Sequence, residues 1–382
     1  MGTRVFKTLP IRTKERLAEI SWFDDLCGGD TEYLSVKQPE RASTYEHCRD
    51  IMITADSLGY SNILLPNSYL PGPDPLVFAA AMAPQTKNIN MLVALRMGEV
   101  YPPTLAKSIA SLDHVLKGRL NINIISSDLP GKIESSEVRY ERTGEVIDIL
   151  RQAWTRDRIQ FDGKYYQIDL PSEPVKSYQQ NRGPLFYFGG ISNQAKDVCA
   201  KYCDVFLMWP EPEQNIYETM KDVSMRAQKQ GRVIDFGLRV HVIVRETEAE
   251  AKAAAKKLMS KFDPVIGEQI KNSAQDSRSL GVFRQDQIRK KADEEGYTEP
   301  FLWSEIGKAR SGCGSAIVGS PEQILYKINR YMDMGIRAFI FSGYPLIEEA
   351  RLFSKLVLPH LPNVKFTDVY GKQPEVHSTL HK

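Results

Sequence analysis

The sequence predicts an α/β protein whose parallel strands close into one barrel. Short β-branched or apolar segments alternate with longer segments of helical periodicity from about residue 19 to residue 357. Such alternation is typical of parallel strands joined by crossover helices. Eight candidate strands can be counted, and eight is the number that closes an α/β barrel. An open, doubly wound sheet shows the same alternation, so the strand count alone leaves that alternative open.

The strands are placed where the apolar segments are short and bounded by turn residues. They are predicted at Glu19–Phe23, Asn62–Leu65, Ile89–Ala94, Leu120–Ile125, Pro184–Phe188, Val205–Trp209, Phe236–Arg245 and Ala338–Phe341. Apolar residues recurring three and four positions apart predict helices between them. Examples are Tyr45–Leu58, Leu105–Leu116, Glu137–Trp154, Ile216–Gln230 and Pro321–Met334.

Two stretches interrupt this alternation. Residues 158–178 carry Asp162-Gly163 between two alternating segments, which predicts a hairpin. Residues 262–312 form a longer break before the last strand, with several glycines and the charged segment IRKKADEEG, which we expect to be helical. A connection of this length predicts a mobile lid over a site or a solvated insertion.

The remaining boundaries set off the two ends of the chain. We expect residues 1–18 to be an N-terminal extension, residues 19–362 to form the barrel, and residues 363–382 to be a tail. The tail has little periodicity and is predicted to run over the surface or onto another subunit.

Composition excludes several classes of protein. Lysine and arginine number 50 and aspartate and glutamate 48, so no net field favours nucleic acid or an anionic membrane. No apolar window approaches a membrane span, and the N-terminus lacks the features of a signal peptide. The five cysteines lack the spacing of a zinc site or a disulfide framework. We therefore expect a cytoplasmic protein without a metal, in which Cys199 and Cys203 are a buried structural pair.

The segment FGLRVHVIVRE contains the first candidate site residues. Strand alternation places Arg239 and His241 on one face and apolar residues on the other. An arginine that faces the interior of a barrel needs an anionic partner to offset its desolvation. A ligand anion and a carboxylate on a neighbouring strand both meet that need, and the segment alone does not choose between them.

Other candidates follow strands at the rim where barrel enzymes place their active sites. YFGGIS combines Gly189, Gly190 and Ser192 at the start of a helix, a pattern that suits a phosphate or an ordinary helix cap. Trp209 and Tyr344 each follow a predicted strand. As large, planar side chains with polar tips, they serve either a ligand or packing.

Five strings in order resemble those of bacterial luciferase-like flavin monooxygenases, and most of all the alkanesulfonate monooxygenases. They are LVALR (92–96), YFGG (187–190), HVIVRET (241–247), ARSGCGSAIVG (309–319) and SGYPLIEEA (342–350). The similarity extends over roughly residues 19–362. It implies a luciferase-like (β/α)8 TIM barrel with a lid insertion before the last strand.

The resemblance also implies an activity. Enzymes of this kind take reduced FMN from a separate NAD(P)H-dependent flavin reductase, react it with O2, and cleave the C–S bond of a small anionic organosulfonate to give an aldehyde and sulfite. They typically form homodimers or homotetramers. By the same resemblance, the residues expected around substrate and flavin are Trp209, Arg239, His241, Tyr344 and, from the lid, Arg310. Those expected to bind the cofactor are Ser126, Tyr140, Gly189, Gly190 and Ser192.

The chain also departs from that pattern. The segment after the second strand, LLPNSYLPGPDPLVF, lacks the cysteine that alkanesulfonate enzymes place near the substrate, and Ser126-Ser127 replaces a threonine-glycine pair. These differences leave other substrates open: a sulfone, a pyrimidine or an aminopolycarboxylate. A deazaflavin-dependent oxidoreductase and a flavin-binding barrel without turnover are further alternatives.

Overall fold

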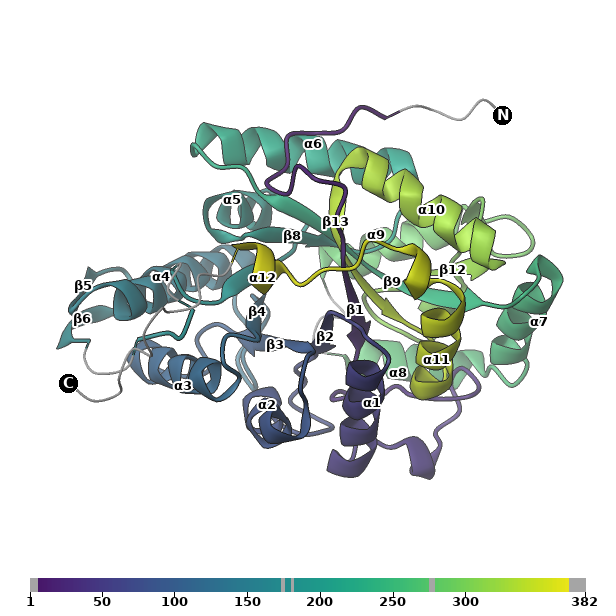
Figure 1. Cartoon of the computed structure of the whole chain (residues 1–382), viewed down its shortest axis with the longest axis horizontal. Helices are drawn as coiled ribbons and strands as arrows, with labels where there is room; N and C mark the ends of the chain where they lie inside the picture. The colour runs from purple at the N-terminus through teal and green to yellow at the C-terminus, as the bar shows by residue number, and fades with distance from the viewer. Residues whose placement is uncertain (1–5, 173–175, 180–181, 275–278, 371–382) are drawn as a thin grey trace.

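The structure, a computed structural model, describes residues 6–172, 176–179, 182–274 and 279–370. Within these residues, eight parallel strands pair in a closed ring, with the eighth returning to the first (Figure 1). In ring order they are β1 (Glu19–Phe23), β2 (Asn62–Leu65), β3 (Asn90–Arg96), β4 (Leu120–Ile125), β7 (Leu185–Phe188), β8 (Val205–Met208), β9 (Asp235–Val244) and β13 (Ile336–Ser342). The predicted barrel is confirmed, and an open sheet is excluded.

Helices surround this ring of strands (Figure 1). They are α1 (Tyr45–Ser57), α2 (Pro75–Met82), α3 (Pro102–Val115), α4 (Ser136–Thr155), α5 (Asn193–Tyr202), α6 (Glu213–Lys229), α7 (Glu248–Met259), α10 (Pro321–Met334) and α11 (Leu346–Leu356). Local sequence fixes several of their ends. A capping box at Ser320 begins α10, and Gly335, in a left-handed conformation at φ 114°, ends it.

The predicted strand boundaries agree best with the observed ones where the apolar segment is bounded by turn residues. Glu19–Phe23, Asn62–Leu65 and Leu120–Ile125 match at both ends. The last strand was predicted too short, because β13 continues through Ser342 on one side and begins at Ile336 on the other. The hairpin is also confirmed, as β5 (Arg158–Asp162) pairs antiparallel with β6 (Gln167–Pro171).

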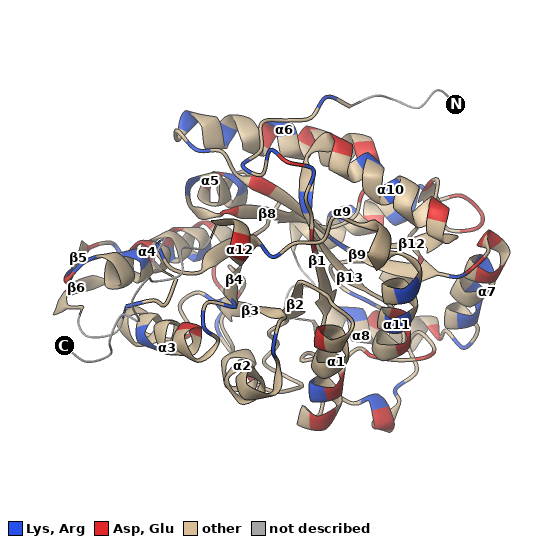
Figure 2. Ribbon diagram, viewed as in Figure 1, with Lys and Arg blue, Asp and Glu red and all other residues tan. Residues whose placement is uncertain are grey.

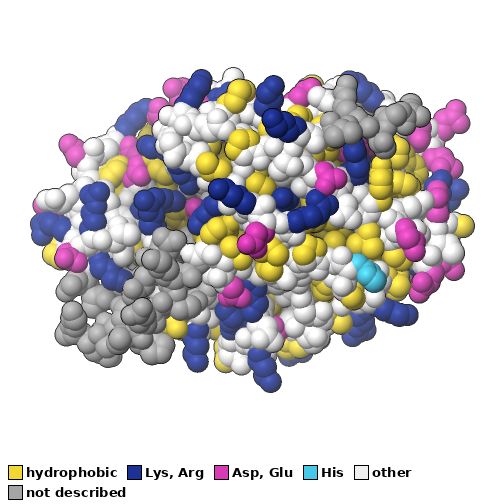
Figure 3. Space-filling model, turned by 45° about the horizontal axis from the view of Figure 1, so that its top comes forward, with side chains coloured by type: hydrophobic (Ala, Val, Ile, Leu, Met, Phe, Trp, Pro, Cys, Tyr) yellow, Lys and Arg dark blue, Asp and Glu magenta, His cyan; other side chains and the backbone are white. Residues whose placement is uncertain are grey.

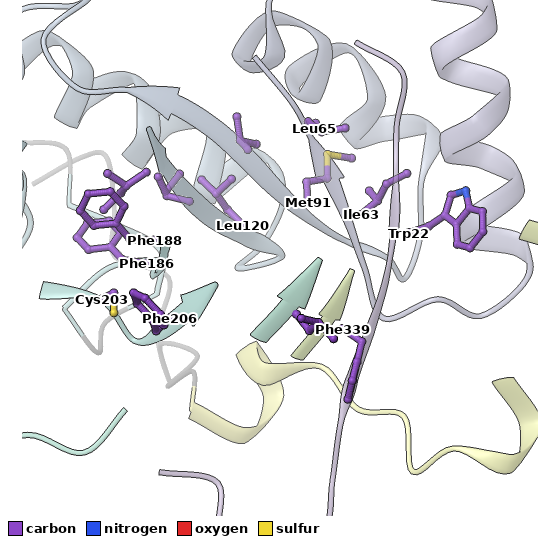
Figure 4. Close-up of a cluster of buried hydrophobic side chains, with 14 of the residues drawn as sticks. Trp22, Ile63, Leu65, Met91, Leu120, Phe186, Phe188, Cys203, Phe206 and Phe339 are labelled. Carbon is purple, nitrogen blue, oxygen red and sulfur yellow. The ribbon is translucent and has the colours of Figure 1, made fainter. Parts of the chain in front are cut away.

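The two faces of each strand have different partners. Outward-facing residues such as Ile63, Met91 and Phe339 belong to a large apolar cluster between the strands and the helices (Figure 4). Inward-facing residues fill the barrel with a smaller cluster that includes Phe23, Leu92 and Tyr187. The strand alternation predicted for β9 holds, since Leu238, Val240 and Val242 all join the outer cluster.

The insertion between β9 and β13 is more structured than the sequence predicted. It contains α8 (Pro264–Ser273), α9 (Leu280–Arg289), β10 (Tyr297–Glu299) and β11 (Leu302–Trp303), followed by the unpredicted strand β12 (Ala316–Gly319). Because β9 is ten residues long, its end extends past β13, and β12 pairs there, with Ala316 opposite His241. The helical prediction for IRKKADEEG is wrong beyond Arg289, where α9 ends.

The tail closes the barrel at the end where the strands begin. Helix α12 (Phe366–Tyr370) lies inside the ring of helices in Figure 1, and Phe366 is fully buried. Its backbone N–H donates to Glu19 at 3.0 Å, while the hydroxyl of Tyr187 donates to the same carboxyl group at 2.5 Å. The tail therefore packs on the barrel as far as Tyr370, in place of the surface course predicted for it. Residues 371–382 lie outside the described part of the chain.

The N-terminal extension packs at the same end. The backbone N–H and hydroxyl of Thr13 donate to Asp235, the first residue of β9, at 2.8 and 2.7 Å. The backbone N–H of Leu9 donates to the carbonyl of Met334 at 3.3 Å. Residues 1–5 lie outside the described part of the chain.

Charged side chains are concentrated on helices and loops, while the strands are mostly uncharged (Figure 2). On the face shown in Figure 3, both signs of charge are spread among apolar and polar side chains. In the described residues, the helices are too short or too polar to span a bilayer.

The packing of the tail is testable with two variants of α12. Phe366→Ala should lower the free energy of unfolding by about 3 kcal/mol, because it removes a fully buried aromatic ring. Val369→Ala, at a side chain 42% exposed, should change it by less than about 0.5 kcal/mol. Urea denaturation followed by circular dichroism measures both. Equal effects of the two variants would show that the tail does not cover the barrel.

Candidate active site

Four of the five residues expected to surround substrate and flavin lie on or just after strands that end at one mouth of the barrel. Arg239 and His241 lie on β9, Trp209 follows β8, and Tyr344 follows β13. Because the carboxyl ends of parallel strands meet at one end of a barrel, residues far apart in sequence converge there. Arg310 reaches the same place from the insertion.

A serine that the sequence analysis did not select joins the two residues of β9. Ser342, the last residue of β13, lies opposite His241 in the strand register. Its hydroxyl accepts from Arg239 Nη2 at 2.8 Å and lies 2.6 Å from Nδ1 of His241. Since arginine can only donate, the serine proton is left for Nδ1. This arrangement favours the neutral imidazole with its own proton on Nε2.

Burial sets the charge states of this pair. Arg239 is 5% exposed and His241 fully buried. Burial, reinforced by the neighbouring cations Arg239 and Arg310, lowers the pKa of His241 well below its ordinary value. The imidazole is therefore neutral at neutral pH. Burial also lowers the pKa of Arg239, though a guanidinium group remains protonated.

Two polar atoms of the pair have no hydrogen-bond partner among the described residues. They are Nη1 of Arg239 and Nε2 of His241, and both are buried. A buried donor without an acceptor is costly, so such atoms mark places where a ligand supplies the missing partner. Of the two partners considered for Arg239, a ligand anion fits this observation, since no ion pair to a carboxylate forms within the described chain.

Aromatic rings hold the two arginines together at the mouth. The guanidinium carbon of Arg239 lies 4.3 Å from the ring centre of Phe23, and that of Arg310 lies 5.4 Å from the same ring. Arg310 is also 5.8 Å from the ring centre of Tyr344, which in turn is 5.1 Å from that of His241. The ring faces attract both cations and reduce the cost of holding like charges close.

The ionisation of Tyr344 and Arg310 follows from this contact. Burial raises the pKa of Tyr344 to about 12, against the opposing effect of Arg310 and Arg239. The phenol is therefore a hydrogen-bond donor at neutral pH. Burial alone would lower the pKa of Arg310, but Tyr344, Cys27 and Asp25 raise it overall. The guanidinium group thus keeps its charge at a partly enclosed position.

Trp209 is covered by the insertion. A Cβ atom at Gly281, in α9, would lie 2.7 Å from the indole ring, and one at Gly312 would lie 3.0 Å from it. Only glycine allows the insertion to approach the ring so closely. Trp209 therefore contacts the segment that brings Arg310 to the site.

The residues expected to bind the cofactor gather at the ends of β4 and β7. Ser192 caps α5, with its hydroxyl accepting from the backbone N–H of Ala195 at 3.1 Å. A Cβ atom at Gly190 would lie 3.0 Å from the hydroxyl of Tyr140. The hydroxyl of Ser126 accepts from the hydroxyl of Thr143 at 3.0 Å, and Thr143 lies one turn after Tyr140 on α4. Glycine is required at position 189 for packing, because a Cβ atom there would lie 2.3 Å from the carbonyl oxygen of Leu207.

The structure thus brings the ten predicted residues together as two groups at one mouth, and adds others to them. Sequence reasoning missed Ser342, Phe23 and Asp25. Each continues the inward alternation of its strand, in β1 through Glu19, Ser21 and Phe23 and in β13 through Ala338 and Ile340. That alternation was the available signal, but the last strand was predicted to end at Phe341, one residue before Ser342, and Asp25 lies two residues beyond the end of β1.

Comparison with known families identifies the family of this chain. Residues 31–338 match the family model described as luciferase-like monooxygenase. The chain belongs to this family. It is accordingly a flavin-dependent monooxygenase, as its resemblance to luciferase-like enzymes implied.

Two curated relatives are similar over nearly the whole chain. A protein of Agrobacterium fabrum named sulfoquinovose monooxygenase is 50% identical over 358 residues, which cover 94% of this chain and 93% of that protein. One of the same name from Novosphingobium aromaticivorans is 46% identical over 354 residues, covering 91% and 98%.

Solved structures of two other monooxygenases share the fold at low identity. A long-chain alkane monooxygenase has a TM-score of 0.73 at 19% identity and covers 90% of this chain, which covers 91% of it in return. An EDTA monooxygenase from Chelativorans sp. BNC1 has a TM-score of 0.73 at 18% identity, with coverage of 95% and 97%. At this identity they support the barrel alone.

The residues at the mouth of this luciferase-like monooxygenase suit a flavin. The N-terminus of α5, with Ser192 beside Tyr140, presents backbone donors to a phosphate. Across the mouth, the unpartnered donors of Arg239 and His241 are buried polar groups that a ligand can satisfy. Both groups lie at the carboxyl ends of strands in one barrel, as a cofactor with a phosphate tail and a reactive ring requires.

The tautomer of His241 provides a test of the Ser342 link. In protein labelled with ¹⁵N-histidine, the wild-type imidazole should be neutral at neutral pH with its proton on Nε2. Ser342→Ala removes the donor to Nδ1 and should produce a mixture of tautomers, seen in long-range ¹H–¹⁵N spectra and assigned with His241→Asn. Ser354→Ala, which removes a hydroxyl bonded to Leu58 instead, is the control. A wild-type ring protonated on Nδ1 contradicts the prediction.

Proposed function

We propose that this monooxygenase uses reduced FMN and O2 to cleave the C–S bond of a sulfonated hexose such as sulfoquinovose. Two arginines support an anionic substrate: Arg239, with a buried donor free, and Arg310, beside the same Phe23 ring. The two relatives named sulfoquinovose monooxygenase, at 50% and 46% identity, supply the substrate class. The free Nη1 donor of Arg239 is the observation that carries the proposal.

The net reaction is balanced by the reagents of a two-component enzyme. A sulfonate RCH2SO3⁻ with O2 and FMNH2 gives RCHO, HSO3⁻, FMN and water. The substrate carbon and the reduced flavin each supply two electrons to O2. When bound, the flavin activates oxygen, and the protein must bind and orient the substrate and exclude water.

Several residues at the mouth have roles in this scheme. A sulfonate has three oxygens, and arginines bind such groups through several donors at once. Arg239 and Arg310 would therefore hold the sulfonate, while His241 donates from Nε2 and Tyr344 from its hydroxyl. The opposite side of the mouth holds the flavin phosphate at Ser192, with Gly190, Tyr140 and Ser126 near it.

Polar groups at the ends of β2 and β3 suit the hydroxyls of a sugar. Asn67 follows β2 and donates to the carbonyl of Ala94 at 3.3 Å. Arg96, at the end of β3, donates to the hydroxyl of Ser127 at 2.8 Å. The loop after β2, where alkanesulfonate enzymes carry a cysteine, thus has a polar amide at the same end of the barrel as the site. A hydroxylated substrate fits this lining better than an alkane chain does.

The remaining parts of the proposal concern partners and setting. Reduced FMN would come from a separate NAD(P)H-dependent flavin reductase, and the enzyme would act as a homodimer or homotetramer. A reducing, cytoplasmic setting agrees with the free cysteines, since Cys48, Cys199, Cys203 and Cys313 are buried thiols. Residues 262–312 would act as the lid that excludes water.

Sulfite release tests the proposed function. Purified enzyme with a flavin reductase, NADH and FMN should release sulfite from sulfoquinovose, and more slowly from an unsubstituted alkanesulfonate. Glucose, which lacks the sulfonate, should give none above the rate without substrate. Absence of sulfite from every sulfonate would overturn desulfonation. Tighter binding of a deazaflavin than of reduced FMN would overturn the choice of cofactor.

The lid is testable through the contact that docks it. Arg284 of α9 donates through Nε and Nη2 to one oxygen of Glu211 at 2.9 and 2.6 Å. Glu211→Gln should weaken docking by about 1 kcal/mol, so amides of α9 should exchange several-fold faster with deuterium. Glu295→Gln breaks an exposed pair with Lys252 and is the control. Unchanged exchange in α9 would show that this contact does not hold the lid.

A further inference from the structure

A carboxyl group at the mouth is not used by the roles assigned above. Asp25 follows β1 and continues the inward face formed by Glu19, Ser21 and Phe23. It is 2% exposed. Its Oδ2 accepts from the hydroxyl of Ser43 at 2.9 Å, and this hydroxyl also accepts from the backbone N–H of Gly28 at 2.8 Å. The carboxyl group is therefore held in one orientation.

Asp25 faces the guanidinium group of Arg310 across a glycine. A Cβ atom at Gly29 would lie 2.5 Å from Nη1 of Arg310 and 3.7 Å from Oδ1 of Asp25. Gly29, with φ +158°, thus lies beside both charged groups, and its lack of a side chain leaves room for them. Arg310 is one of the two arginines proposed to hold the sulfonate, so Asp25 lies beside the position of the substrate's anionic end.

We propose that Asp25 is the general base that accepts the proton lost from the sulfonate-bearing carbon. This inference rests on the proposed function. In the net reaction, one C–H bond of that carbon breaks and its hydrogen leaves as a proton. The electron pair of that bond remains on carbon and forms a C–O bond to an oxygen atom from O2 as the O–O bond breaks, and a lone pair of this oxygen completes the C=O bond. The C–S pair leaves with sulfur as SO3²⁻, and Asp25 takes the proton.

The other groups at the mouth are less suited to this step. Burial raises the pKa of Tyr344 to about 12, so the phenol stays protonated. The pKa of His241 is lowered well below its ordinary value by burial, and its Nδ1 already accepts from Ser342. Burial also raises the pKa of Cys313, whose thiol donates to the carbonyl of Arg239.

Asp25 differs in its ionisation. Burial, as the largest cause, raises its pKa to about 7, with Asp30 adding to the rise and Ser43 and Arg310 opposing it. A base is most effective when its pKa lies near the working pH. The other titratable groups that face it are His47 and Cys48 on α1, Tyr344 after β13 and Asp24 beside it.

The neighbouring carboxyl group provides a matched control. Asp24 is also fully buried and directly precedes Asp25, but Arg310 is not among the groups that affect its ionisation. Its Oδ1 accepts from the backbone N–H of Asp25 at 2.7 Å, a bond that asparagine can keep. Asp24→Asn therefore tests the effect of removing a buried carboxyl group from this loop without removing the proposed base.

The first experiment compares turnover of sulfoquinovose by Asp25→Asn, Asp25→Ala and Asp24→Asn. Asp25→Asn should lower kcat by about 100-fold or more, with reduced-FMN binding unchanged. The wild-type rate should rise with pH through the Asp25 pKa of about 7, and this rise should disappear in Asp25→Asn. Formate should restore part of the activity of Asp25→Ala, because a small carboxylate can replace the missing base. Asp24→Asn should keep the wild-type pH profile.

Two results would overturn the inference. One is an Asp25→Asn variant with wild-type kcat and pH profile. The other comes from infrared difference spectra between acid and alkaline pH, which need no turnover. A carboxyl band that titrates near neutrality should be present in wild type and Asp24→Asn and missing in Asp25→Asn, and its absence from wild type rejects the base. Failure of the proposed function appears separately, as a wild-type enzyme that releases no sulfite.

Discussion

A buried guanidinium group, that of Arg239, is the charge around which the mouth of the barrel is organised. Isolated in an apolar interior, such a charge would be too costly to keep. Here the hydroxyl of Ser342 and the ring of Phe23 satisfy part of it. One donor, Nη1, is left without a partner in the described chain. The protein therefore carries an unfavourable interaction that an anionic ligand relieves, and binding energy becomes tied to the sign of the substrate's charge.

That arrangement depends on a barrel closed firmly at the other end. Glu19, Tyr187 and the backbone of Phe366 form a buried hydrogen-bonded group where the strands begin. The strands of the same barrel carry the site residues at their opposite ends, so this hydrogen-bonded group helps to hold the strands in register. The unpartnered donors of Arg239 and His241 lie at the mouth, where a ligand can satisfy them. Stability and function are separated along the barrel axis, as is usual for this fold.

The insertion gives the site its second arginine and its cover. Gly281 and Gly312 let it approach Trp209, and Gly29 leaves room for Arg310 beside Asp25. Glycine is needed at these positions because any side chain would occupy the space between insertion and barrel. The insertion is held by the polar contact of Arg284 with Glu211 and by a buried apolar cluster that includes Trp303, Ile306 and Leu258. In the proposed function, this one element both supplies Arg310 to the substrate and excludes water from the site.

The sequence by itself determined the alternation of strands and helices, the hairpin of β5 and β6, and the inward face of β9 that carries Arg239 and His241. These are properties of neighbouring residues, so a periodic pattern reveals them. The resemblance to luciferase-like enzymes added Arg310 and the cofactor residues. Only the tertiary structure decided that Ser342 joins Arg239 to His241, that α12 seals the barrel, and that Asp25 faces Arg310. Each of these contacts joins residues distant in the chain, and strand register and barrel closure, which no local pattern encodes, bring them together.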